Sequence, residues 1–142
     1  MATSMFGLIQ ALFGGNQISE EKQQEIFAET LFMVLSGATR ADLNIESVEV
    51  EKVKTILKRT LNREYSLAEI KLAGETDLLE TAPIQKYVDK ASKKLSVEQR
   101  QQILHAMTEV FRSDGSMGVL ETDFYNKIAG ALSLTPAQML CT

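Results

Sequence analysis

Apolar residues recur every three to four positions along most of this chain, which is the period of an amphipathic α-helix. The widest apolar stripe lies within positions 19–39 and predicts a central helix; it consists of Ile26, Thr30, Met33, Val34 and Gly37, with Phe27, Leu31 and Leu35 beside them. The same period predicts further helices over about 46–61, 66–80, 84–92, 96–111, 119–132 and from 136 onward. No segment shows the strict alternation of a half-buried strand, so we predict an all-α fold.

Local signals mark where these helices begin. Three starts carry a Ser or Thr followed three positions later by Glu or Gln, the pattern of a capping box: Ser66 with Glu69, Ser96 with Gln99, and Thr135 with Gln138. In such a box each side chain accepts a hydrogen bond from a backbone amide that the helix leaves unpaired. Thr81-Ala82-Pro83 is expected to break the chain between two helices, because proline disfavours the helical form of the residue before it.

A weak internal repeat relates two parts of the chain at an offset of 72 residues. Arg40-Ala41-Asp42 aligns with Arg112-Ser113-Asp114. Apolar positions follow the same register: Leu31 with Ile103, Phe32 with Leu104, Leu35 with Met107, Ile45 with Met117, Val48 with Leu120, and Ile56 with Ile128. Neither half can bury its apolar face alone. We therefore predict a compact bundle of about six to seven helices built from two pseudo-symmetric helical hairpins.

Composition narrows the classes of function. The chain has 142 residues, enough for one core, and we assign residues 19–142 to a single helical domain. A nucleic-acid binder needs a basic stripe, and the net charge of −4 with scattered lysines argues against such a partner. The single cysteine, Cys141, excludes a disulfide scaffold and fits a reducing, cytoplasmic compartment. With one Cys and one His, a metal site would need oxygen ligands and a hard ion.

The N-terminal segment, residues 1–18, is apolar and is treated separately. Met5, Leu8, Ile9 and Leu12 fall on one helical face, followed by Gly14-Gly15. No Lys or Arg precedes Lys22, so the basic start of a signal peptide and the basic face of a membrane-lying helix are both missing. We expect a docking helix that packs on its own domain or on a partner, with peripheral membrane contact or disorder as the alternatives.

The two acidic turns identify a family resemblance. The second turn runs from Phe111 through Asp114-Gly115 to Glu121, and the first from Thr39 through Asp42 to Glu49. Two such motifs, each with an Asp and a helix-opening Glu and about 70 residues apart, resemble the tellurite-resistance TerB-like family over roughly residues 19–138. Leu43 stands where the family usually has Gly; Asn44 could supply the left-handed residue instead.

This resemblance implies a helical, non-enzymatic, stress-associated interaction module. TerB-like domains occur joined to other domains, including membrane-bound J-domain co-chaperones. By that analogy the chain would bind a partner protein, at the inner membrane face or elsewhere in the cytoplasm. The resemblance also implies metal binding at acidic residues in these places.

Four acids therefore form the candidate metal site: Asp42, Glu49, Asp114 and Glu121. Two symmetric carboxylate pairs suit a hard divalent cation such as calcium or magnesium. An EF-hand does not fit, because its twelfth position would fall on Val53 or Tyr125 instead of Glu. The alternative is structural: Asp before Gly is common in turns, and Glu in a first helical turn stabilises the positive end of the helix dipole.

Three further alternatives stay open at this point. Arg40 and Arg112 could neutralise the acids by salt bridges, which would weaken the metal hypothesis. A metal-dependent hydrolase could use the same acids, although no separate base is evident: His105, flanked by Leu104 and Ala106, has no triad partner visible and is interpreted as structural. A purely structural homo-oligomer that hides the N-terminal segment is the third possibility. We assign no catalytic residue.

Overall fold

The structure, a computed structural model, describes residues 19–41, 47–75, 81–111 and 119–140. Within these ranges it contains seven helices and no strand, which confirms the all-α prediction. The helices are α2 (Glu20–Ala41), α3 (Ser47–Leu61), α4 (Leu67–Glu75), α5 (Thr81–Ser92), α6 (Val97–Phe111), α7 (Val119–Ala131) and α8 (Pro136–Leu140). The predicted docking helix within residues 1–18 lies outside the described residues.

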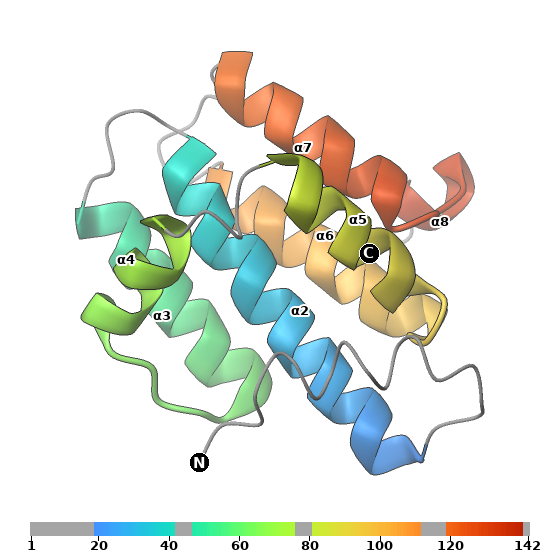
Figure 1. The fold of residues 1–142 in the computed structure, drawn as a ribbon, viewed down its shortest axis with the longest axis horizontal. Helices are drawn as coiled ribbons and strands as arrows, with labels where there is room; N and C mark the ends of the chain where they lie inside the picture. Colours follow the sequence, from blue (N-terminus) through green and yellow to red (C-terminus); the bar gives the residue numbers. More distant parts are fainter. Residues whose placement is uncertain (1–18, 42–46, 76–80, 112–118, 141–142) are drawn as a thin grey trace.

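Helix α2 is the central element, as its wide apolar stripe predicted. It contacts α3, α4, α5, α6 and α7. Figure 1 shows it crossing the molecule with α3 and α4 on one side and α5 and α7 on the other. Between Ile26 and Thr39 every residue is buried except Glu29 and Phe32, which are partly exposed. A helix that is apolar on nearly every side is stable in water only when other helices surround it.

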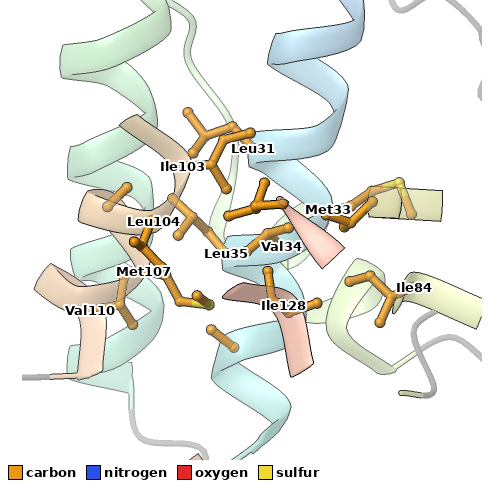
Figure 2. Packing of buried hydrophobic residues seen from close by; sticks show 14 of the residues in the cluster. Leu31, Met33, Val34, Leu35, Ile84, Ile103, Leu104, Met107, Val110 and Ile128 are labelled. Atoms are coloured by element: carbon orange, nitrogen blue, oxygen red, sulfur yellow. The ribbon is translucent and has the colours of Figure 1, made fainter. Parts of the chain in front are cut away.

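Part of the core lies between α2 and α6. In Figure 2 the side chains of Leu31 and Leu35 point toward Ile103, Leu104 and Met107. All five are at most 2% exposed. Each such side chain contributes about 1.5–3 kcal/mol through the apolar surface that it removes from water. The contact between α2 and α6 is therefore one part of an apolar core to which α3, α4, α5 and α7 also contribute buried residues.

The predicted caps are present. Both reciprocal hydrogen bonds of a capping box form at each of three helix starts, with lengths of 2.9–3.2 Å: Ser66 with Glu69, Ser96 with Gln99, and Thr135 with Gln138. At the start of α2, the Lys22 amide donates to Ser19 Oγ at 3.1 Å. The described part of α4 ends at Glu75, and the expected continuation to residue 80 lies outside the described residues.

The predicted break at Thr81-Ala82-Pro83 is wrong. Helix α5 begins at Thr81, and Pro83 is its third residue. Proline is tolerated in the first turn of a helix because the amides of that turn have no intrahelical acceptor. The proline therefore lies inside the start of α5 and not in a linker before it.

Helices α2 and α4 approach each other at Gly74. A Cβ atom on this residue would lie 2.6 Å from the carbonyl oxygen of Ser36 and 3.0 Å from Thr39 Oγ1. Backbone atoms cannot yield as a flexible side chain does, so only glycine fits here. Gly130 on α7 differs, because a Cβ there would meet no atom within 4 Å.

Glu29 is the single charged residue in the buried stretch of α2, and it is half-buried. Burial raises the pKa of its carboxyl group, and the charge of Arg63 acts in the opposite direction. On α5, burial raises the pKa of the Tyr87 phenol to about 12, and the charge of Glu29 adds to this rise. Burial therefore raises the pKa of both groups.

We expect Gly74→Ala to lower the free energy of unfolding by about 1–3 kcal/mol, since the added methyl group forces α2 and α4 apart. Gly130→Ala is the matched control: it adds the same methyl group to an open helical site, and we expect it to raise the free energy of unfolding by about 0.5–1 kcal/mol. Urea unfolding measures both changes. Equal effects of the two substitutions would contradict the close approach at Gly74.

We expect Glu29→Gln to stabilise the protein at pH 7–8 by less than about 1 kcal/mol, because solvent screens a half-exposed carboxylate. Because folding raises the pKa of Glu29, the folded state binds its proton more tightly, and the native protein loses stability as the pH rises through that pKa. The advantage of Gln should therefore shrink as the pH falls toward the ordinary value of 4.5. Thermal unfolding of the native protein and the Gln variant between pH 4.5 and pH 8 tests this pH dependence. Asp89→Asn, at an exposed site of α5, is the control. An advantage that does not depend on pH would contradict this assignment.

Candidate functional site

Two of the four predicted acids lie in helices that the structure describes. Glu49 is the third residue of α3 and Glu121 the third residue of α7. The two helices begin at Ser47 and Val119, 72 positions apart, which is the offset of the sequence repeat. Figure 1 shows the ends of α2 and α6 and the starts of α3 and α7 at the same end of the bundle.

The geometry of the acidic site itself is not described. Asp42 and Asp114 lie outside the described residues, as does Arg112. For Glu49 and Glu121 the structure describes the helical backbone alone. Within the described part of the chain, no group of three His, Cys, Asp or Glu side chains is placed to hold a metal ion. Binding of a cation by the four acids stays a prediction.

Outside the predicted site, the described residues bring together charged side chains of α3 and α6. The guanidinium group of Arg59 donates two hydrogen bonds to the carboxylate of Glu109, at 2.8 and 3.1 Å. Lys52 Nζ lies 3.8 Å from the same carboxylate. These contacts, led by the hydrogen bonds from Arg59, lower the pKa of Glu109. The pair joins α3 to α6 through residues that are 50 positions apart in the chain.

A second carboxylate, that of Glu64, forms ion pairs with Lys54 and Lys58 of α3. Glu64, which follows α3, bridges Lys58 Nζ and Lys54 Nζ, the latter at 3.3 Å. The ammonium group of Lys54 also donates to the Tyr65 carbonyl oxygen at 3.0 Å. The hydrogen bonds from Lys58 and Lys54 hold the pKa of Glu64 below its ordinary value. The side chain of Glu64 nevertheless stays 67% exposed.

These contacts define a basic face on α3, made of Lys52, Lys54, Lys58 and Arg59. Its four cations share the two carboxylates of Glu64 and Glu109. The surplus of positive charge is notable because the whole chain carries a net charge of −4. Exposed ion pairs of this kind contribute only about 0–1 kcal/mol each to stability, so the fold does not require this arrangement.

A groove runs beside the basic face, between α3 and α6. Its volume is about 390 Å³, and its walls include Arg59, Gln101, Gln102, His105, Ala106 and Glu109. A second hollow of about 490 Å³ adjoins it at Arg59 and is bordered by Lys54, Lys58 and Glu64. Amide, imidazole and guanidinium groups along these hollows are suited to hydrogen bonding and charge recognition.

This region was not predicted from the sequence. His105 had been interpreted as a structural residue, whereas it is exposed on α6 and lines the groove. A signal for each pair of cations was present, since Lys52 and Arg59 are seven residues apart and Lys54 and Lys58 four apart, spacings that bring the members of each pair onto one side of the helix. The pairing with Glu109 had no such signal, because it depends on how α3 packs against α6.

None of the helices in the described ranges combines the length and apolar character needed to cross a bilayer. This observation covers the described residues alone.

Comparison with known proteins bears on the family. A family model described as tellurite resistance protein TerB matches residues 28–140, which is most of the chain and runs from within α2 to the end of α8. No curated protein and no solved structure gives a significant match. On the strength of the family match, the chain belongs to the TerB family of tellurite resistance proteins.

Proposed function

We propose that this protein is a non-enzymatic, stress-associated protein-interaction module that binds a divalent cation through Asp42, Glu49, Asp114 and Glu121. The observation that carries the proposal is the TerB family match over residues 28–140, which includes all four acids. Calcium and magnesium are the cations that best suit carboxylate ligands. The cation would fix the two acidic turns and so regulate the binding of a partner.

The arrangement of the helices supports a shared site. The two acidic turns connect α2 to α3 and α6 to α7, and the adjoining helix ends lie at one end of the bundle (Figure 1). Glu49 and Glu121 occupy equivalent third positions in their helices, 72 residues apart. Internal duplication of one helical hairpin accounts for both features and supplies the ligands in two matched pairs.

The described surface favours recognition through polar contacts. Among the described residues, Leu72 is the one large hydrophobic side chain that is exposed, at 65%. A partner that bound these residues through a broad apolar patch would require more such side chains. Charged and amide groups, as on α3 and α6, suit a partner that binds reversibly. We place this activity in the cytoplasm, where the lone Cys141 would remain a thiol.

Calorimetric titration of calcium, magnesium and manganese into the full chain tests the cation site. We expect saturable binding of at least one ion, weakened at least about tenfold in the Asp42→Asn/Asp114→Asn variant, since changes to groups that merely support a metal ligand already cost about 10–100-fold. An Asp89→Asn/Asp123→Asn variant removes the same charge elsewhere and should bind as the native protein does. The absence of binding to the native chain would show that the four acids are turn and cap residues.

A further inference from the structure

The position of α5 shows which surface of the other repeat a helix would cover. Helix α5 packs on α2 and α7. Ser92 Oγ donates to the Ala131 carbonyl oxygen at 2.9 Å, and a Cβ on Gly37 would lie 3.3 Å from Ile84 Cδ1. Gly37 and Ala131 therefore mark the surface on which α5 lies.

The groove between α3 and α6 is the equivalent surface. At the repeat offset of 72 residues, Gly37 corresponds to Glu109 and Ala131 to Arg59, and both counterparts line the groove. The contact between α2 and α7 likewise corresponds to the contact between α6 and α3, and both contacts are present. The same offset assigns the counterpart of α5 to residues 9–20, which lie directly before α2 and at its first residue.

The N-terminal segment, residues 1–18, repeats the apolar spacing of α5. Four apolar residues of α5 are buried, at intervals of three, one and three positions: Ile84, Tyr87, Val88 and Ala91. Four apolar residues of the segment follow the same intervals: Met5, Leu8, Ile9 and Leu12. Positions three, one and three residues apart share one face of a helix. Each pattern therefore predicts a short helix with one apolar face directly before a long helix of the bundle.

The two patterns lie 79 positions apart, seven more than the repeat offset of 72. Five of these seven positions belong to α2, since Val97, the first residue of α6, corresponds to Glu25, whereas α2 begins at Glu20. The remaining two lengthen the turn between the apolar pattern and α2. The difference in spacing is therefore a longer helix and a longer turn, with the order of elements unchanged.

The start of α2 places the segment beside the groove. Gln23 Nε2, in the first turn of α2, donates to the Lys94 carbonyl oxygen at 2.9 Å. Lys94 lies in the turn before α6, and Glu98 in the first turn of α6 lines the groove. Residues 14–19 can span about 20 Å when extended, whereas the five additional residues lengthen α2 by only about 7.5 Å. The chain before α2 is therefore long enough to return to the groove.

The charges of the groove suit an uncharged occupant. Arg59 and Glu109 satisfy each other through two hydrogen bonds, so this pair requires no charge from a bound segment. Residues 1–19 contain no Asp, Glu, Lys, Arg or His. Ala106 and the methylene groups of Gln101 and Gln102 offer apolar contact to the face that carries Leu8 and Leu12.

The walls of the groove are more polar than the surface that α5 covers. Buried apolar residues of α2 and α7 have polar or charged counterparts in the groove: Ile26 has Glu98, Met33 has His105, and Leu132 has Thr60. Glu98 and His105 are exposed and can keep their contact with water at the edges of the groove. A docked helix would therefore be held less firmly than α5, and the groove would remain soluble when that helix leaves.

We propose that the N-terminal segment docks reversibly, as a short helix, into the groove between α3 and α6 of its own chain. Met5, Leu8, Ile9 and Leu12 face the groove, as the buried residues of α5 face α2 and α7. Lys54 and Lys58 are not among the groove's walls, so the docked segment leaves these cations of the basic face accessible. The proposal does not depend on the cation site, and each can fail without the other.

Nitroxide broadening of His105 tests the docking in the full chain. His105 is the single histidine, so its imidazole protons give an unambiguous NMR signal, and Cys141 is the single cysteine. The Cys141→Ser/Gln10→Cys variant therefore carries one nitroxide, on the side of the predicted helix opposite Leu12. We expect strong paramagnetic broadening of the His105 signals, which disappears when the nitroxide is reduced.

A matched pair of substitutions in this labelled chain separates docking from mere tethering. Leu12→Asp should lower the paramagnetic relaxation rate at His105 about threefold or more, because a carboxylate that faces the groove would lose its hydration. Phe6→Asp adds the same carboxylate outside the apolar face and should leave the rate unchanged.

Three results would overturn the proposal. Equal relaxation rates in Leu12→Asp and Phe6→Asp would show a tethered segment that does not dock. In a mixture with an isotope-labelled chain that carries no nitroxide, broadening of that chain's His105 would assign the groove to the segment of a second copy. Absence of broadening would place the segment elsewhere, and its binding to phosphatidylcholine vesicles would then assign it to a lipid surface.

Discussion

The burial of α2 on nearly all sides is the constraint on which the rest of the structure depends. This helix of 22 residues contacts five others, and no other element of the described chain joins both sides of the bundle to this extent. Its buried hydroxyl groups are partly satisfied within the helix: Thr30 Oγ1 donates to the Ile26 carbonyl oxygen, and Thr39 Oγ1 to that of Ser36, both at 2.6 Å. The hydroxyl group of Ser36, also buried on α2, has no hydrogen-bond partner among the described residues, so two of the three buried hydroxyl groups of α2 are satisfied within the helix.

The same constraint leaves the outer surface of α3 and α6 available for recognition. Both helices pack against α2. Their apolar stripes include residues such as Ile56 and Met107, which are fully buried. Their remaining sides carry the basic face and the groove. Because exposed ion pairs contribute little to folding, these side chains can be suited to a partner without loss of the core. The proposed functions accordingly concern the surface of α3 and α6 and the two acidic turns, while the buried residues stabilise the fold.

The features that were predicted correctly from the sequence depend on interactions between residues close together in the chain. The capping boxes and the apolar period of α2 depend on residues a few positions apart, so both are visible in one chain and both are confirmed. Pro83 was misinterpreted because proline ends one helix and begins another with equal ease. The Arg59–Glu109 pair could not be predicted, since it joins positions 50 residues apart through packing geometry. The repeat offset of 72 equals the spacing between the starts of α3 and α7, whereas the acidic site that it suggested stays a prediction.

Native-state hydrogen exchange tests the central role of α2 most directly. If α2 joins both sides of one core, its slowest amides, between Leu31 and Leu35, should exchange only through complete unfolding. Their free energy of exchange should then equal the free energy of unfolding from urea denaturation, and the slowest amides of α3 and α7 should lose protection in the same transition. Exchange of the α2 amides at a distinctly lower free energy, with α5 and α7 still protected, would contradict the account by showing two cores that open independently.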